Sequence, residues 1–328
     1  MELGAWLASS PAALIVVCAL LGLLIGSFLN VVILRLPARL QHEWEAQSRE
    51  ILALVALGEG TAHAQVPPTE SGTESPDSSR AAQNRAAVAE ALEPVVPQAP
   101  PDIVLARSRC PRCGHNLSPW ENIPLLSFLL LRGRCRACRN PISWQYPLVE
   151  ALTGLAFAVC AWRYGLTPQL AIALVASSAL IALSGIDMRT QLLPDQITLP
   201  LLWFALLAAA LGWTIGPVQA IFGAALGYLS LWSVYWVFKL LTGKEGMGYG
   251  DFKLLAALGA LVGVRGILPI VLIASFLGAI MGSIQLAVQG RDRATPIPFG
   301  PYLAAAGFIQ LVMGSTILAA WNAWFGLG

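Results

Sequence analysis

The chain has 328 residues, of which 56% are hydrophobic and only 12% are charged, and its mean hydropathy is +0.67. Soluble domains usually carry about 25% charged residues, so this composition excludes an ordinary soluble globular protein. The formal net charge of +2 is small for this length, and we expect no nucleic-acid partner. The composition predicts an all-α polytopic membrane protein in contact with the lipid bilayer.

Eight apolar runs are long enough, or nearly so, to span a membrane, which takes about 20 apolar residues. They cover residues 12–34, 147–162, 168–186, 196–214, 217–241, 252–264, 266–289 and 299–325. The second and sixth runs are short, so seven or nine spans are alternatives to eight. The first run has no basic residue ahead of it and no small-residue cleavage site after it, so we interpret it as a retained helix.

Basic residues indicate how the chain is oriented. The segment 35–146 contains twelve arginines, and with eight alternating spans six further basic residues lie on the same side, against two on the other. Because basic loops remain in the cytoplasm, we expect this segment to be cytoplasmic and both termini to face outward. The predicted organisation is a first transmembrane helix over 1–34, this cytoplasmic segment, and a membrane core of about seven helices over 147–328.

Within the cytoplasmic segment, residues from about 61 to 102 are rich in Ala, Pro, Ser and Glu and show no periodicity. Such a composition cannot bury enough apolar surface to offset the entropy of ordering, so we expect a disordered insert. Residues 43–57, just before this insert, can form a short helix.

Two CxxC pairs follow, Cys110 with Cys113 and Cys135 with Cys138, and 21 residues separate them. Two such pairs hold a tetrahedral Zn²⁺ ion through four thiolates. A cytoplasmic location keeps thiols reduced and so favours a metal, while disulfides, redox activity and free thiols are the alternatives. His115 follows the first pair and is a possible replacement ligand. We expect a structural zinc site on the four cysteines, placed between the first two transmembrane helices.

Two polar residues lie near the cytoplasmic ends of apolar runs. Asn30 is near the end of the first run, and its simplest interpretation is a hydrogen bond between helices. Glu150 begins the second run, where a carboxylate can simply face lipid headgroups; a functional role is the alternative.

Two aspartates lie at the predicted cytoplasmic ends of spans. Asp187 ends the third run, and Asp251 begins the sixth after a loop with glycines at 246, 248 and 250. A carboxylate at a membrane boundary is costly and indicates function, and glycines let a peptide backbone approach closely. The alternatives are structural: Asp187 can pair with Arg189, while Asp195 suits the start of a helix.

Two carboxylates at one membrane depth can share a proton, because like charges close together cannot both ionise. The ionised carboxylate then activates water while the neutral one hydrogen-bonds a scissile carbonyl, which gives amide hydrolysis without a covalent intermediate. We therefore expect Asp187 and Asp251 to be catalytic, with Gly248, Gly250 and Lys253 supporting the loop or binding substrate. No histidine lies beside a span, and no GxSxG or HExxH motif is present.

The proline-rich stretch from 291 to 302 is interpreted as a rigid helix start, an active-site wall, or both. A proton-coupled transporter that uses the two aspartates is the rival function, because buried carboxylates and glycine-broken helices also suit transport. A zinc-stabilised membrane scaffold is a third reading.

The motifs resemble those of the bacterial type IV prepilin peptidases, which belong to the GxGD-type intramembrane aspartyl proteases. The matching stretches run from the first span to the last: Gly26–Val32, the two CxxC pairs, Tyr146–Glu150, Asp187 with Leu193–Asp195, Lys244–Lys253 and Thr295–Pro301. The insert at 61–102 is longer than the family pattern and lies outside every matched motif.

The resemblance implies an inner-membrane enzyme with periplasmic termini that cuts the short basic leader from prepilins and from type II secretion pseudopilins on the cytoplasmic side. In the family, the cut follows a Gly, and Asp187 and Asp251 stand at the positions of the two catalytic aspartates. Many members also methylate the new N-terminus with S-adenosylmethionine, and this chain retains the associated cysteine pairs. No cofactor-binding residue is assigned.

Overall fold

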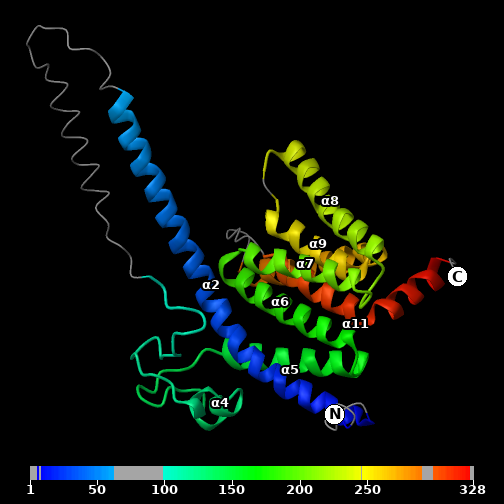
Figure 1. The fold of residues 1–328 in the computed structure, drawn as a ribbon, viewed down its shortest axis with the longest axis horizontal. Coiled ribbons are helices and arrows are strands. Elements are labelled where there is room, and N and C mark those ends of the chain that lie inside the picture. The colour runs from blue at the N-terminus through cyan, green and yellow to red at the C-terminus, as the bar shows by residue number, and fades with distance from the viewer. Residues whose placement is uncertain (1–5, 7–8, 63–98, 245, 290–297, 326–328) are drawn as a thin grey trace, which may run out of the picture. The chain divides into compact units, whose positions relative to one another are not determined.

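The computed structural model describes residues 6, 9–62, 99–244, 246–289 and 298–325. Over these residues the chain is helical, with no β-strand and only two isolated bridges, which confirms the predicted all-α class (Figure 1). The helices are α2 (Pro11–Ala62), η2 (Pro119–Asn122), α4 (Leu126–Leu130), α5 (Gln145–Tyr164), α6 (Pro168–Thr190), α7 (Asp195–Ala210), α8 (Pro217–Thr242), α9 (Tyr249–Val262), α10 (Val264–Gln289) and α11 (Gly300–Phe325).

Proline and glycine set many of the helix boundaries. Pro168 and Pro217 begin α6 and α8, where a missing N–H costs nothing and the fixed φ already suits a helix. Gly165 and Gly243 end α5 and α8 with positive φ angles of 60° and 70°. A residue in this left-handed conformation stops a helix, and glycine adopts it without strain.

The eight predicted apolar runs correspond to the eight long helices α2 and α5 to α11. Among the described residues, five of these are long and apolar enough to cross a membrane: α2, α6, α8, α10 and α11. Helices α5, α7 and α9 are not in this group. The chain is a helical membrane protein, and the count of eight spans stays a prediction.

Contacts divide the chain into two units, residues 1–34 with 107–328, and residues 35–106. Helix α2 does not end at residue 34 as predicted but continues to Ala62, and it includes the short helix expected at 43–57. Pro37 removes one backbone hydrogen bond, which is not enough to stop the helix. Most of the predicted insert at 61–102 lies outside the described residues.

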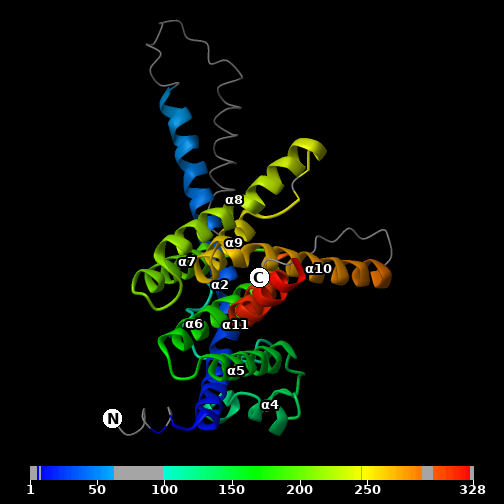
Figure 2. The same cartoon turned by 90° about the vertical axis from the view of Figure 1, so that its right-hand side faces the viewer.

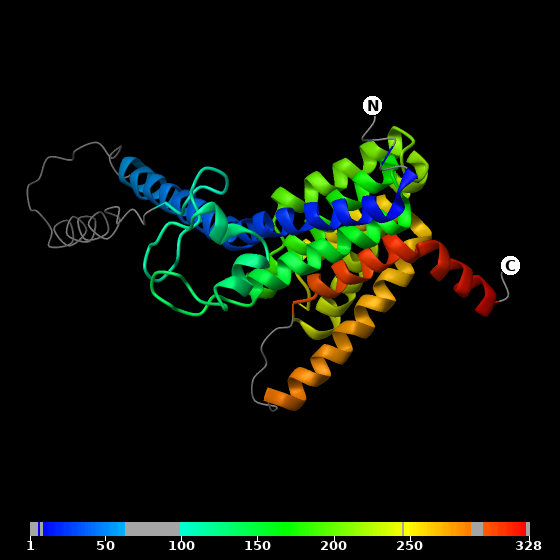
Figure 3. The same cartoon turned by 90° about the horizontal axis from the view of Figure 1, so that it is seen from below.

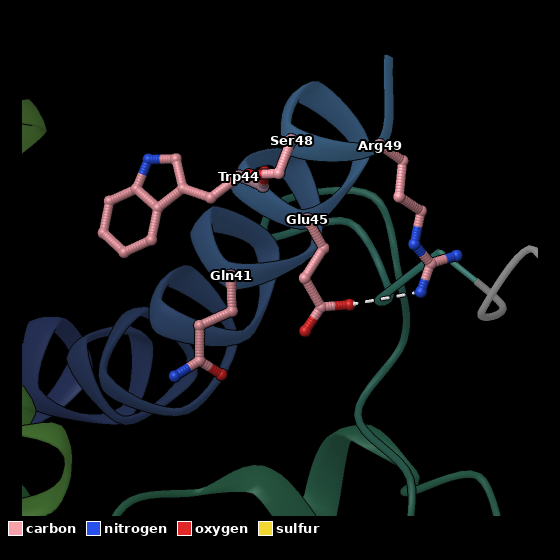
Figure 4. A pocket seen from close by; sticks show the side chains of 5 residues that line it. All are labelled: Gln41, Trp44, Glu45, Ser48 and Arg49. Atoms are coloured by element: carbon pink, nitrogen blue, oxygen red, sulfur yellow. Dashed lines mark hydrogen bonds and ion pairs between the residues drawn. The ribbon is translucent and has the colours of Figure 1, made fainter. Parts of the chain in front are cut away.

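Within the second unit, two arginines of α2 hold the returning chain. Arg39 forms an ion pair with Asp102 at 3.1 Å, and Arg35 donates to the carbonyl of Ala106 at 2.9 Å. Figure 4 shows another face of α2, where Gln41, Trp44, Glu45, Ser48 and Arg49 line a shallow depression. All five belong to consecutive turns of one helix, with Glu45 and Arg49 paired at 3.9 Å, so this face does not enclose a ligand.

Helix α9 lies at the centre of the first unit and packs against α7, α8 and α11 (Figures 1 and 2). It is short and buried on every side, with Phe252, Leu254 and Leu255 fully enclosed. A helix that is apolar all round belongs in a core, and this position fixes the element that carries Asp251. Helix α10 packs along α11, and its C-terminal end points away from the other helices (Figure 3).

Glycines set the spacing between α8 and α9. A Cβ atom on Gly223 would lie 2.1 Å from the carbonyl oxygen of Gly259, so the two backbones touch directly. Small residues at such a crossing allow helices in a membrane to approach closely. Gly259 lies about two turns after Asp251 in α9, so this contact fixes the position of the helix that carries the aspartate.

Candidate active site

The structure brings the two predicted aspartates together inside the helical core. Asp187 lies in the last turn of α6 and is 5% exposed, while Asp251 lies in the first turn of α9 and is 6% exposed. Their carboxyl groups are close enough to repel each other when both are charged. In a region from which water is largely excluded, such a pair retains one proton between its members.

Asp187 is supported by the start of another helix. The backbone N–H of Gly300, the first residue of α11, donates to Oδ2 of Asp187 at 3.0 Å. The dipole of α6 opposes a charge on Asp187, but the N-terminus of α11 favours one. Sequence reasoning did not assign this hydrogen bond to Gly300, although Gly300 lies in the proline-rich stretch 291–302 that was interpreted as a possible active-site wall.

Asp251 uses the start of its own helix. Gly248 is the N-cap residue of α9, its carbonyl accepts the N–H of Asp251 at 3.2 Å, and its own N–H interacts with the Asp251 carboxylate. This arrangement is half of a capping box. The other carboxyl oxygen, Oδ1, is buried and has no hydrogen-bond partner among the described residues. A buried polar atom of this kind is available to a proton, a water molecule or a substrate.

Leu193, which the sequence did not single out as a site residue, packs between the two helix starts. A Cβ atom on Gly250 would lie 2.6 Å from the Cβ of Leu193, and one on Gly300 would lie 3.2 Å from its Cδ2. Gly250 and Gly300 therefore allow the first turns of α9 and α11 to close around this side chain. The packing brings the supports of both aspartates to one place.

Lys253 and Asp195 connect α9 to α7. The Nζ of Lys253 lies 2.7 Å from both carboxyl oxygens of Asp195, in a partly exposed ion pair. Asp195 is therefore already engaged by a cation, and its side chain is 48% exposed, unlike the two buried aspartates. In this arrangement Lys253 supports the start of α9.

The four cysteines form two equivalent turns. In each, the backbone N–H of the first cysteine donates to a carbonyl five residues ahead, from Cys110 to His115 at 2.9 Å and from Cys135 to Asn140 at 2.8 Å. The fifth residue of each turn, Gly114 or Arg139, has a positive φ angle. Isolated bridges, Arg109 with Asn116 and Arg134 with Pro141, close both turns.

The sulfur positions fit a metal ion. The four Sγ atoms lie within 4.8 Å of one another, and those of Cys110 and Cys138 are 3.8 Å apart. A tetrahedron with metal–sulfur bonds of about 2.3 Å has edges of about 3.8 Å, so this spacing is the one that four thiolates around one ion require. All four are free thiols, which excludes disulfides among them. His115 is not part of this cluster, and its Nε2 lies 3.3 Å from the carboxylate of Glu121.

Hydrogen bonds prepare one of these thiols to bind a cation. The backbone and side-chain N–H groups of Asn140 donate to Cys138, with Nδ2 at 3.3 Å from the sulfur, and they lower the pKa of Cys138 to about 6. A thiolate is the form that coordinates a metal. The turn therefore stabilises the ligand in its metal-binding state.

The bundle of apolar helices buries two neighbouring carboxylates, one at the end of α6 and one at the start of α9, and this defines the chain as a helical membrane protein with an aspartate pair. Residues 20–164 match the Bacterial Peptidase A24 N-terminal domain, and residues 174–283 match the Type IV leader peptidase family. The chain belongs to the type IV leader peptidase family, as its similarity to curated relatives also shows.

Three of these relatives are named prepilin leader peptidase/N-methyltransferase. The protein from Xanthomonas campestris pv. campestris is 49% identical over 307 residues, covering 94% of each chain. The protein from Pseudomonas aeruginosa is 47% identical over 318 residues, covering 97% of this chain and 96% of its own. The protein from Aeromonas hydrophila is 45% identical over 298 residues, covering 91% and 90%. No solved structure matches the chain.

Proposed function

We propose that the chain is an aspartic endopeptidase that removes the leader peptide of type IV prepilins and type II secretion pseudopilins. Membership of the leader peptidase family and the names of its relatives support this reaction. The observation that carries the assignment of residues is the buried pair of Asp187 and Asp251, with one carboxyl oxygen of Asp251 unpartnered. The rival function, a proton-coupled transporter, is supported neither by the family membership nor by the aspartate pair.

The contacts of the two aspartates suggest which one is ionised. Asp187 receives the N–H of Gly300 and faces the N-terminus of α11, so it is the better site for the negative charge. The shared proton then resides on Asp251, where Oδ1 has no donor to satisfy it as an anion. Under this assignment Asp187 is the general base and Asp251 is the general acid.

Hydrolysis follows from these roles. Asp187 takes a proton from a water molecule while the water oxygen attacks the scissile carbonyl carbon, and Asp251 hydrogen-bonds and protonates the carbonyl oxygen. The tetrahedral intermediate collapses, the carbon–nitrogen bond breaks, and the leaving amine takes up a proton from the pair. No covalent bond to the protein forms at any step.

The names of the relatives also support methylation of the new N-terminal residue, with S-adenosylmethionine as the methyl donor. The residues that would bind this donor are not assigned. We further propose that Cys110, Cys113, Cys135 and Cys138 hold a Zn²⁺ ion, whose role at a closed four-thiolate site is structural. We also propose that the enzyme lies in the bacterial inner membrane, with the cysteine segment and the aspartates facing the cytoplasm and both termini in the periplasm.

Cleavage of a purified prepilin by the purified protein tests the proposed function. Asp187→Asn and Asp251→Asn should each lower kcat/KM by at least about 100-fold, since general acid–base groups contribute 10²–10⁴-fold. Asp102→Asn is the control, because it removes an aspartate that is exposed and paired with Arg39, outside the unit that carries Asp187 and Asp251. Melting temperatures report folding, and full activity in either folded variant would assign that aspartate a structural role.

A further inference from the structure

A third buried acidic residue lies at the contact between α2 and α5. Glu150, in the second turn of α5, is 7% exposed. Its carboxylate accepts the backbone N–H of Leu125 at 2.9 Å and interacts with the side chain of Ser27. The simple interpretation, a carboxylate facing lipid headgroups, therefore does not describe this residue.

Asn30 is buried at the same helix contact and is 1% exposed. Its Nδ2 donates to the carbonyl of Tyr146 at 3.1 Å and to that of Gly26 at 3.3 Å, so the expected hydrogen bond between helices is present. Its Oδ1, however, is buried with no hydrogen-bond partner among the described residues. The amide nitrogen of Asn30 therefore has hydrogen-bond partners, whereas its amide oxygen has none among the described residues.

Helical spacing places both residues on one surface. Ser27 and Asn30 are three residues apart on α2, and Tyr146 and Glu150 are four residues apart on α5, which puts each pair on one helix face. The backbones are also close, because a Cβ atom on Gly26 would lie 2.7 Å from the Cα of Glu150. The Glu150 carboxylate and the Asn30 amide therefore face the same contact between α2 and α5.

Among the described residues, the Glu150 carboxyl group is held by hydrogen bonds rather than by a cation. No ion pair among the described residues includes Glu150. Buried charges are normally paired, and an unpaired buried carboxylate is costly. Together with Oδ1 of Asn30, the site offers several acceptors, and a primary ammonium group carries one positive charge and three donors, which match them.

Packing and hydrogen bonds connect the site to α6, the helix that carries Asp187. One turn beyond Asn30, Ile33 packs on α6 so tightly that a Cβ atom on Gly185 would lie 2.5 Å from its Cδ1. Gly185 is two residues before Asp187, and Arg189 of the same helix donates to Gln145 at the start of α5 at 2.7 Å. Short contacts therefore link the Glu150 site to the last turn of α6.

We propose that Glu150 and Asn30 bind a primary ammonium group of the peptide substrate. The proposal rests on the proposed function, because leader cleavage creates a new α-amino group beside Asp187 and Asp251. A lysine of the basic leader carries the same chemical group and is the other possible source. Leu125 links the site to the cysteine segment, and its φ of 58° and ψ of −46° show a backbone held in an unusual conformation at this contact.

Peptide binding to the unmodified full-length protein in nanodiscs tests the proposal first. A mature pilin peptide is compared with its N-acetylated form, and a free leader peptide, which has no bond left to cut, is compared with one whose lysines are replaced by norleucine. A loss of affinity of at least tenfold in the first comparison identifies the α-amino group, and in the second the lysine. No loss in either comparison overturns the proposal.

A variant then connects the binding to Glu150. Glu150→Gln keeps an acceptor for the Leu125 N–H but removes the charge, and it should abolish the tenfold preference for the charged peptide. Thr153→Val is the control, because Thr153 is buried one turn further along α5 and its hydroxyl donates to the Val149 carbonyl of the same helix. Retention of the preference in Glu150→Gln overturns the proposal. The mature peptide needs no cleavage, so failure of the wild type to cut prepilin would count against the proposed function alone.

Discussion

The backbone N–H of Gly300 donates to Oδ2 of Asp187 across 113 residues of sequence, at a distance of 3.0 Å. The hydrogen bond joins the end of α6 to the start of α11. It compensates for the unfavourable position of Asp187 at the C-terminal end of its own helix, because the N-terminus of α11 stabilises a negative charge. The properties of the aspartate pair thus depend on a residue with no side chain.

Replacement of Gly300 tests this dependence. The Cβ atom of Gly300→Ala would lie 2.6 Å from Oδ2 of Asp187, so the carboxylate has to move. Small displacements of a catalytic group cost about 100-fold in rate, and we expect kcat for prepilin cleavage to fall by about that factor. Gly278→Ala is the control, because its nearest neighbour, Cδ2 of Tyr302, is 3.4 Å away. Equal activity of the two variants would contradict the role of Gly300.

The two glycines that precede Asp251 should respond differently to alanine. At Gly250, the new Cβ would lie 2.6 Å from the Cβ of Leu193, and such overpacking costs about 1–3 kcal/mol. At Gly248, the nearest atom is Oδ2 of Asp251 at 3.8 Å, so only the N-cap preference is lost, at about 1 kcal/mol. Melting temperatures and cleavage rates should therefore fall further in Gly250→Ala, and the reverse order would be inconsistent with this packing.

Removal of one thiolate should empty the metal site. We expect one metal ion per chain in the wild type and none in Cys110→Ser or Cys138→Ser, as measured by elemental analysis of the purified protein. Cys18→Ala is the control, because Cys18 is buried in α2 outside the cysteine cluster. Since structural metals contribute directly to folding, a chelator should also expose residues 110–138 to protease. Unchanged metal content in Cys138→Ser would disprove the site.

The pH dependence of cysteine alkylation tests the hydrogen bonds to Cys138. In the metal-free protein, its pKa of about 6 means that the thiolate is the main form at pH 7 and is lost as the pH falls below 6. For Cys113, the His115 N–H favours the thiolate, but desolvation and the neighbouring thiols raise the pKa to about 11. Iodoacetamide should therefore modify Cys138 before Cys113 at pH 7, although Cys113 is the more exposed.

Asn140→Ala provides the matching control for this measurement. The variant removes one donor to the Cys138 sulfur, so the pKa of this thiol should rise towards the ordinary value near 8.5. Alkylation of Cys138 at pH 7 should then slow, and mass spectrometry of the modified peptide gives the rate. If Asn140→Ala reacts as fast as the wild type, the Asn140 side chain does not set the pKa.

Much of the architecture is predictable from local sequence, because helix formation in a membrane depends on runs of apolar residues. The eight runs became eight helices, and proline and glycine marked many of their ends. The extent of α2 was not predicted, because the apolar run ends at residue 34 while the helix continues to Ala62 through a polar segment. The cysteine cluster was predicted well, because two CxxC pairs carry their turn geometry within a few residues.

The supports of the aspartates were predicted less well for a physical reason. Asp187 and Asp251 stand out because a carboxylate at an apolar boundary is costly, and this signal is local. The contacts of Asp187 with Gly300 and of Glu150 with Leu125 join distant segments, and no periodicity records them. The glycine-rich and proline-rich stretches indicated that backbone groups take part in the site, but they did not indicate which side chain each group contacts.

The groups that hold the aspartate pair are main-chain amides, Gly300 for Asp187 and Gly248 for Asp251. Alanine scanning removes no backbone amide hydrogen, so it would identify the two aspartates and miss the amides that orient them. Replacement of the Gly300 amide by an ester, through incorporation of an α-hydroxy acid, deletes the donor and adds no bulk. The activity of the aspartate pair can therefore be altered at glycine positions, which have no side chain to replace, by a change in the backbone itself.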